Sequence, residues 1–325
     1  DVLNKKISAY AQLGQDDVVL KLFGRMQYDD LNQGIDTVLL VLKSCATVED
    51  LWIGRKIHKW IVKKKMELDL TLGNTLLNMY VKCGALEEAL EVFERIPARN
   101  VVSWTALISG YVEHGLGHQA LECFAKMRDE GVHPSAITYA CLLKACGIVR
   151  FLDVGECIDI EIRKQGLLKK DVVLGTALVD MYSKCGALEK AQEVFDELLI
   201  RNVVTWNAVI DGYARHGRGD EALKFFRRMQ DEGIPPDAVT ALCILKSCAS
   251  TGSLKLGEEI HVELCNRGFG VEQAGVLGTA LMDMYAKCGL LDKAKQVFDN
   301  LPTRDVVSCN VLMDGYLQHG LMDDV

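Results

Sequence analysis

The stretch VVTWNAVIDGY, which runs from Val203 to Tyr213, decides the fold because it recurs along the chain. VVSWTALISGY begins at Val101 and VVSCNVLMDGY begins at Val306, so successive copies start 102 and 103 residues apart. Residues 1–10, which end in ISAY, are a fourth copy that lacks its first residue. Similarity at a near-constant interval is typical of repeat proteins, and residues 1–325 are therefore expected to form a single array.

Each interval divides into three modules. A second stretch begins at Ile35, Ala136 and Ala238 and carries Leu-Lys, a small residue and Cys. A third begins at Leu70, Val172 and Gly275 and carries Met-Tyr followed by Lys-Cys-Gly. The predicted modules are residues 1–34, 35–69, 70–100, 101–135, 136–171, 172–202, 203–237, 238–274, 275–305 and a truncated 306–325. Complete modules have 35, about 36 and 31 residues in rotation.

Every module predicts two helices. In module 101–135, apolar residues spaced at i, i+3, i+4 and i+7 form one helical face, and a second apolar stripe follows the turn: Trp104, Leu107, Ile108 and Tyr111, then Ala120, Leu121, Phe124 and Met127. A single hairpin cannot bury such a face, but stacked neighbours can. The sequence therefore predicts an all-α fold, an α-solenoid superhelix of stacked helix-turn-helix repeats of 31–37 residues.

Composition and charge restrict the function. The chain is 49% hydrophobic and 25% charged, as expected of a folded domain, and no run of 18 apolar residues predicts a membrane span. The net charge of −8 argues against a general cationic nucleic-acid binder, so a polyanion would need a local basic strip. Because Asp1 lies inside a periodic segment, we expect the chain to be part of a longer protein, with no transit peptide in it.

No catalytic or metal site is predicted. The twelve cysteines lack C-x-x-C spacing and are expected to be small buried packing residues in a reducing compartment. His261-Val-Glu263 matches the H-x-E of zinc deaminases, but the P-C-x-x-C partner is absent. The chain also lacks a P-loop, a G-x-S-x-G motif and a G-x-G-x-x-G motif after a strand. We therefore expect no catalysis, no metal and no cofactor.

The hairpin that carries VVTWNAVIDGY resembles a pentatricopeptide repeat, and the rotating lengths resemble the P, L and S motifs of the plant PLS subclass. On that resemblance, modules 1–34, 101–135, 203–237 and 306–325 are P-like, modules 35–69, 136–171 and 238–274 are L-like, and modules 70–100, 172–202 and 275–305 are S-like. Tetratricopeptide repeats share the Ala-x-x-x-Phe of the second helix, as in Ala222 to Phe226, but their period is a constant 34 residues.

The resemblance implies a protein of mitochondria or chloroplasts that binds single-stranded RNA, with one base read by each repeat. The family reads bases with the fifth and the last residue of a repeat. The fifth residues of the P- and S-like modules are all Asn or Thr: Asn4, Asn74, Thr105, Thr176, Asn207, Thr279 and Asn310. The last residues are Asn100, Asn202, Asp237 and Asp305, with Gly34 and Ser135 as departures. The L-like modules have Leu39, Ala140 and Leu242 at the fifth position and are expected to read little.

Each reading residue has a structural alternative. Last-position Asn and Asp are also good N-caps for the next helix. Fifth-position Asn and Thr are also compatible with a first helical turn. Helix interiors do not favour Asn or Thr, however, and their recurrence in seven modules favours the reading role.

Hydrogen-bond chemistry assigns bases to the pairs. An Asp only accepts, which suits the ring N–H of uracil or guanine, whereas an Asn can also donate to adenine or cytosine. In the family pattern, a fifth-position Thr accompanies purines and Asn accompanies pyrimidines. The pairs then resemble readers of cytosine (Asn74 and Asn100), a purine (Thr105 and Ser135), adenine (Thr176 and Asn202), uracil (Asn207 and Asp237) and guanine (Thr279 and Asp305). With RNA running 5′ to 3′ along the repeats, the expected site is Y-n-C-R-n-A-U-n-G-Y.

Two further sets of residues are predicted to contact RNA. The resemblance implies that the second-position residues Val102, Val173, Val204, Val276 and Val307 stack on bases, with ordinary packing at a helix start as the alternative. The basic thirteenth-position residues Lys82, Lys184, Arg215 and Lys287 could form a phosphate rail, with a solvated face as the alternative. Glu113 interrupts this row.

The main expectation is a non-catalytic array that selects cytidines for C-to-U editing of organellar transcripts. The resemblance implies partners in an editing complex, and a deaminase domain acting in cis, outside this chain, or in trans. Two other functions stay open at this point. One is stabilisation, processing or splicing of RNA. The other is a protein-interaction scaffold in an organellar assembly, which the acidic net charge and the departures at Gly34 and Ser135 favour.

Overall fold

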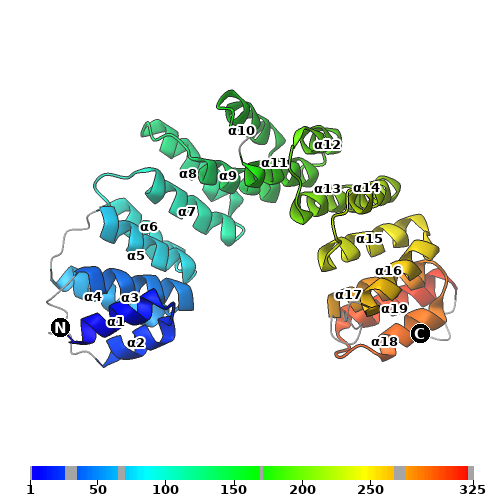
Figure 1. Cartoon of the computed structure of the whole chain (residues 1–325), viewed down its shortest axis with the longest axis horizontal. Helices are drawn as coiled ribbons and strands as arrows, with labels where there is room; N and C mark the ends of the chain where they lie inside the picture. The colour runs from blue at the N-terminus through cyan, green and yellow to red at the C-terminus, as the bar shows by residue number, and fades with distance from the viewer. Residues whose placement is uncertain (1, 26–34, 65–69, 169–170, 267–274, 321–325) are drawn as a thin grey trace. The chain divides into compact units, whose positions relative to one another are not determined.

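The computed structural model describes residues 2–25, 35–64, 70–168, 171–266 and 275–320. Within these ranges the chain forms nineteen helices and no strand (Figure 1). None of these helices is long and apolar enough to cross a membrane. The prediction of an all-α fold is confirmed.

The chain divides into two compact units, residues 1–149 and 150–325. The helices of the first unit are α1 Val2–Gln12, α2 Asp16–Gly24, α3 Ile35–Val48, α4 Leu51–Lys63, α5 Leu70–Lys82, α6 Leu86–Arg95, α7 Val101–Glu113, α8 Gly117–Asp129 and α9 Ala136–Val149. The helices of the second unit are α10 Leu152–Lys164, α11 Val172–Lys184, α12 Leu188–Glu197, α13 Val203–Arg215, α14 Gly219–Asp231, α15 Ala238–Thr251, α16 Leu254–Asn266, α17 Gly275–Lys287, α18 Leu291–Asp299 and α19 Val306–Gln318.

Each unit is a stack of helical hairpins, as expected for a solenoid. Within a unit, an odd-numbered helix packs on the even-numbered helix that follows it in that unit, and also on the unit's next odd-numbered helix. The first unit thus has a row formed by α1, α3, α5, α7 and α9. The second has a row formed by α11, α13, α15, α17 and α19 (Figure 1). Each row places the first turns of successive repeats next to one another.

Local signals decide where the first helices begin and end. Helix α7 begins after Asn100, whose side chain accepts hydrogen bonds from the backbone N–H groups of Val102 and Ser103. It ends at a turn in which Gly115 has a φ of 74°, a left-handed conformation that favours glycine. Asn202 begins α13 in the same way, and Gly217 follows that helix with a φ of 73°.

The apolar stripes predicted from the sequence form the core between the helices. Trp104 and Trp206 are almost completely buried, and each packs edge-to-face on a Phe of the preceding module, with ring centroids 4.7 and 4.6 Å apart. Burying a large apolar side chain stabilises the fold by about 1.5–3 kcal/mol. Because each Trp contacts the module before it, this energy is available only to stacked repeats.

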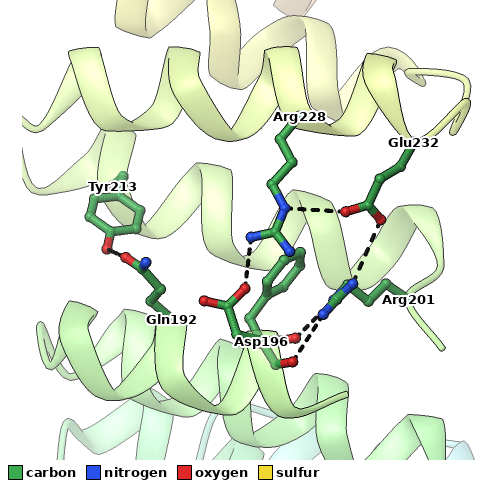
Figure 2. A network of polar contacts seen from close by, with 7 residues as sticks. Gln192, Asp196, Arg201, Tyr213, Arg228 and Glu232 are labelled. Carbon is green, nitrogen blue, oxygen red and sulfur yellow. Dashed lines mark hydrogen bonds and ion pairs between the residues drawn. The ribbon is translucent and has the colours of Figure 1, made fainter. Parts of the chain in front are cut away.

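Polar contacts connect module 172–202 to module 203–237 on the side of the second helices (Figure 2). Arg228 on α14 donates to Asp196 on α12 at 2.7 Å and to Glu232 at 3.1 Å. Arg201 donates to the backbone carbonyl of Phe195 at 2.9 Å and lies 3.7 Å from Glu232. Ion pairs this exposed contribute at most about 1 kcal/mol each, so the network adds little to the stability that the buried core provides.

The cysteine prediction is correct only in part. All twelve cysteines are free, and those of the Leu-Lys-small-Cys motif, Cys45, Cys146 and Cys248, have no exposed surface. Burial raises the pKa of Cys45 and of Cys248 to about 12, which makes these thiols unreactive. Cys157 and Cys265 are exposed, contrary to the prediction, because they lie on the outer faces of α10 and α16.

Candidate nucleic-acid interface

The predicted reading side chains lie at the N-terminal ends of the odd-numbered helices. A fifth residue lies in the first turns of its own helix, and a last residue lies at the N-cap of the next odd-numbered helix. Asn100, Asn202, Asp237 and Asp305 all accept backbone N–H bonds there through Oδ1. The capping role considered as an alternative is therefore real. It uses one atom of each side chain and leaves the amide Nδ2 or the carboxylate Oδ2 for another partner.

In module 70–100 the fifth and last residues are joined through a residue of the next repeat. Ser103 Oγ donates to Asn74 Oδ1 at 2.7 Å and lies 3.3 Å from Asn100 Oδ1. Both side-chain oxygens of the asparagines are thereby occupied. Their Nδ2 groups have no partner within the described ranges, so the pair presents two hydrogen-bond donors.

In module 203–237 the fifth and last residues are again joined through a hydroxyl of the next repeat, and they also bond to each other directly. Asn207 Nδ2 donates to Asp237 Oδ1 at 2.9 Å, and Thr240 Oγ1 donates to Asn207 Oδ1 at 2.6 Å. Burial acts to raise the pKa of Asp237, but hydrogen bonds from Thr240 and Asn207 outweigh it and lower this pKa below its ordinary value. The pair presents the acceptor Oδ2 of Asp237 and one remaining N–H of Asn207.

Two of the three modules with a fifth-position Thr are joined through paired hydroxyls. Thr176 Oγ1 lies 2.7 Å from Thr205 Oγ1, which in turn donates to Asn202 Oδ1 at 3.0 Å. Thr105 Oγ1 lies 2.7 Å from Thr138 Oγ1, which lies 2.9 Å from Ser135 Oγ. Either hydroxyl can be the donor in the bond between Thr176 and Thr205. In the arrangement in which Thr205 gives its proton to Asn202, Thr176 donates to Thr205 and keeps its lone pairs as acceptors.

Other predicted reading residues are not brought together. Thr279 donates to the carbonyl of Gly275 at 2.7 Å, while Asp305 caps α19 by accepting from Ser308 N at 2.8 Å. Asn4 Oδ1 is buried without a hydrogen-bond partner in the part of the chain that the structure describes. Asn310 is exposed on α19, and Gly34 lies outside the described residues.

The second-position valines lie on the surface. Val102, Val173, Val204, Val276 and Val307 are each more than half exposed, so none of them is a core residue. Ile137 and Val239, the second residues of two L-like modules, are equally exposed. These two residues were not predicted to contact RNA, although their position in the repeat is the same. Base stacking on this row stays a prediction.

The predicted phosphate-rail residues are all engaged by carboxylates. Three pair with an Asp one turn earlier in the same helix: Lys184 with Asp180 at 2.7 Å, Arg215 with Asp211 at 2.5 Å and Lys287 with Asp283 at 2.9 Å. Lys82 pairs with Glu113 of the next repeat at 2.9 Å. Among the exposed lysines without an ion pair in the described ranges, three occupy equivalent positions on the first helices of the L-like modules: Lys43, Lys144 and Lys246.

The described residues hold no group of three His, Cys, Asp or Glu side chains that could bind a metal ion. His261 of the H-x-E match forms a hydrogen bond through Nδ1 with the hydroxyl of Tyr285 at 2.9 Å. Its environment is that of a packing residue on α16.

The hydroxyls that join the reading pairs were also not predicted from the sequence. Ser103, Thr138, Thr205 and Thr240 are each the third residue of a repeat, and none of them has exposed surface. A sequence signal was present, because Ser or Thr at the third position of a helix completes a capping box. Their bonds to residues about 30 positions earlier could not be read from that signal.

Comparisons with known proteins identify the repeats. The model of the PPR repeat family matches residues 99–147 and 201–250. A second model, of the single PPR repeat, matches residues 7–31, 74–101, 176–203, 279–306 and 307–325. Together these segments include most of the chain.

Curated relatives from Arabidopsis thaliana resemble the chain over nearly its whole length. The chain is 38% identical to the chloroplastic pentatricopeptide repeat-containing protein At1g11290, over 97% of this chain and 38% of the relative. It is 40% identical to the mitochondrial pentatricopeptide repeat-containing protein At3g24000, over 86% of this chain and 44% of the relative. The chain thus spans less than half the length of these two relatives.

Solved structures show the same fold. PPR10 in complex with an 18-nucleotide psaJ RNA element superposes with a TM-score of 0.75 at 20% identity, covering 99% of this chain and 53% of PPR10. PPR10 from maize gives a TM-score of 0.57 at 19% identity, covering 99% of this chain and 57% of PPR10. The repeated hairpins, the family matches and these relatives together show that the chain belongs to the pentatricopeptide repeat family.

Proposed function

We propose that the chain binds single-stranded RNA sequence-specifically, with one base read by each P- or S-like repeat. The observation that carries this proposal is the joining of fifth and last side chains at the helix N-termini of four modules. In these pairs the capping bonds occupy some polar atoms and leave others free. The free atoms differ between modules, as a device that distinguishes bases requires.

The free atoms fit the base edges assigned above. Asn74 and Asn100 present two donors, which suit the N3 and O2 acceptors of cytosine. Asn207 and Asp237 present one donor and one acceptor, which suit a carbonyl and the ring N–H of uracil. Thr176 and Asn202 present an acceptor and a donor, which suit the amino group and N1 of adenine. The RNA complex of PPR10, a protein of the same fold, is consistent with this role.

Fluorescence anisotropy with labelled RNA tests the proposal. The chain is expected to bind a strand carrying Y-n-C-R-n-A-U-n-G-Y more tightly than a scrambled strand of equal composition. In Asn207→Thr the preference opposite module 203–237 is expected to change from U to G, since the family pattern pairs Thr and Asp with guanine. Changing the base opposite the L-like module 238–274 should have little effect and serves as the control. Equal binding of all strands by both proteins would contradict sequence-specific reading.

The rotation of repeat lengths supports a more specific role in C-to-U editing of organellar transcripts. On this proposal the array is of the PLS subclass and binds upstream of the edited cytidine, which a deaminase domain in cis or in trans converts. Both relatives named above carry an organellar designation, one chloroplastic and one mitochondrial.

Transcript sequencing in plants that lack the full-length protein tests the editing role. Cytidines a few nucleotides 3′ of a matching site are expected to remain unconverted. Normal editing with altered transcript ends or retained introns would support RNA processing or splicing instead.

A scaffold function has one observation in its favour. Leu199 and Ile200 are 86% and 65% exposed and help to line a pocket of about 440 Å³. The other two S-like modules have Pro97-Ala98 and Pro302-Thr303 at these positions. Contiguous exposed apolar surface is a feature of protein-interaction sites, and this pair would contribute to such a surface. Leu199→Ser with Ile200→Ser should leave RNA binding unchanged if this surface serves a partner protein.

A further inference from the structure

The third residue of each repeat varies with the fifth residue of the repeat before it. Where the preceding repeat has Asn or Thr at its fifth position, the third residue is Ser or Thr: Thr37, Ser103, Thr138, Thr205, Thr240 and Ser308. Where the preceding repeat is L-like, with Leu39, Ala140 or Leu242, the third residue is Leu72, Leu174 or Leu277. The hydroxyl is therefore present only where a polar reading side chain precedes it.

Helix capping does not explain this pattern. Asp171 caps α11 by accepting from Val173 N and Leu174 N at 2.9 and 3.3 Å, and the third residue of that helix is a leucine. An N-cap in this chain thus forms without a third-position hydroxyl. Burying a hydroxyl is unfavourable unless it gains hydrogen bonds, and in four repeats those bonds go to the preceding fifth residue.

The hydroxyl holds both reading side chains of one base at once. In module 203–237, Thr240 Oγ1 accepts from Asp237 N at 3.1 Å and lies 2.6 Å from Asn207 Oδ1 and 3.0 Å from Asp237 Oδ1. Thr240 is completely buried and Asn207 is only 7% exposed. Their geometry is therefore set by protein packing before any ligand binds.

We propose that the third-position hydroxyls Ser103, Thr138, Thr205 and Thr240 are specificity-determining positioning residues, a role that rests on the proposed RNA-binding function. Each would fix which atoms of the preceding fifth and last side chains remain free to meet a base. A primary amide can present either its oxygen or its nitrogen, and a hydroxyl can donate or accept. A neighbouring hydroxyl that occupies one of these groups removes the ambiguity.

The consequence differs between fifth-position Asn and Thr. With Thr240 donating to its Oδ1, Asn207 can offer only N–H groups. With Thr205 donating to Asn202, Thr176 must donate to Thr205 and can offer only lone pairs to a base. Each reading unit then consists of three side chains, and the third comes from the next repeat.

The test replaces Thr240 by Val, which keeps the shape and removes the hydroxyl. Affinities are measured by anisotropy for the full chain with strands carrying U or C opposite module 203–237, and A or G opposite module 172–202. One mismatched donor–acceptor pair gives the unchanged chain a preference of roughly tenfold for U over C. Thr240→Val should reduce this preference to about twofold or less, while its preference for A over G stays unchanged. Thr240→Ser should restore the preference for U.

Thr205→Val should show the converse result. It should lose the preference for A over G opposite module 172–202 and keep the preference for U over C opposite module 203–237. Ser247→Ala serves as a matched control, because Ser247 is a buried hydroxyl on the same helix whose bond goes only to the carbonyl of Cys243. It should leave both preferences unchanged.

The results distinguish a failure of the positioning role from a failure of base reading itself. If the unchanged chain does not distinguish U from C, the proposed reading itself fails. If it does, and Thr240→Val discriminates equally well, the positioning role is overturned. The positioning role is also overturned if Thr240→Val weakens binding to all four strands by the same factor and keeps both preferences, because that is the signature of a purely structural residue.

Discussion

Asp237 uses its two carboxylate oxygens for different purposes. Oδ1 accepts from Thr240 N and from Asn207, and this fixes both the start of α15 and the orientation of the neighbouring amide. Oδ2 is left for another donor. Because the pKa of Asp237 is lowered, the carboxylate is ionised at neutral pH and can only accept. Its stabilising bonds are present above the pKa of the unfolded chain and are lost as the pH falls through the lower folded-state value.

Two partly buried histidines are expected to make the stability of the fold depend on mildly acidic pH. His58 and His261 form hydrogen bonds with the hydroxyls of Tyr80 and Tyr285 at 2.8 and 2.9 Å. Burial lowers the pKa of both histidines, and a nearby cation, Arg95 beside His58, lowers it further. Nε2 of His58 is buried without a partner in the described ranges, so a proton added there would be unsatisfied.

We predict that acidification from about pH 7 to about pH 5 lowers the urea midpoint of the chain, since histidine titrates in this window. The sign follows from the lowered pKa values. The folded state holds the imidazoles neutral, so stability is full above the unfolded-state pKa and is lost as the pH falls through the folded-state pKa. The double variant His58→Gln with His261→Gln should lose less of its urea midpoint over the same interval. An equal loss in both proteins would contradict this origin of the pH dependence.

At the scale of the helix, glycine sets how closely successive first helices approach. A Cβ on Gly212 of α13 would lie 2.6 Å from both Cβ and Oγ of Ser183 on α11. A Cβ added to Gly110 of α7 would likewise lie 2.8 Å from Cγ1 of Val81 on α5. These atoms are close to the backbone and cannot move aside, so the contact requires a residue without a side chain.

Gly212→Ala is therefore expected to destabilise the second unit by about 1–3 kcal/mol, the usual cost of overpacking. Chemical denaturation followed by circular dichroism would measure it. Gly275→Ala is the matched control, because that glycine begins α17 and no contact within 4 Å of the added Cβ is found in the described part of the chain. Alanine is the better helix former, so the control should be neutral or slightly more stable. Equal stability of Gly212→Ala and the unchanged chain would show that α11 and α13 can separate.

For the whole molecule, charge limits how strongly a polyanion can bind. The net charge is −8, and the four thirteenth-position cations all pair with carboxylates. A phosphate must compete with those carboxylates for each cation. We therefore expect a shallow dependence of RNA affinity on salt, since few counterions are released per strand.

The triple variant Asp180→Asn, Asp211→Asn and Asp283→Asn is expected to raise RNA affinity several-fold and to steepen the salt dependence between about 50 and 200 mM. Each change frees one cation on a first helix. Anisotropy titrations at several salt concentrations would measure both effects.

A second triple variant separates the freed cations from the change in net charge. Asp220→Asn, Asp231→Asn and Asp292→Asn alters the net charge equally, but these residues lie on second helices. If both triple variants bind RNA alike, the thirteenth-position residues are not a phosphate rail.

Much of the fold was predictable because its causes are local. The apolar spacing of Trp104, Leu107 and Ile108 defines a helical face within a few residues, and Asn100 and Asn202 mark the helix starts by their own capping chemistry. The pairs that engage the basic row were also within reach, since Asp180 precedes Lys184 by one helical turn. The exposure of Cys157 could not be predicted from the sequence, because it depends on which face of α10 the neighbouring helices cover.

The sequence by itself determined the repeat, the helices and the positions of the fifth and last residues, because periodicity and capping act over single turns. Only the tertiary structure decided how those residues are joined. Thr240 meets Asn207 because α15 packs beside α13, and the two residues are 33 positions apart. Thr279 has the same kind of sequence neighbour in Ser308 but bonds to Gly275 instead. Contacts between successive repeats depend on the distance between their helices, and that distance cannot be predicted from a short stretch of sequence.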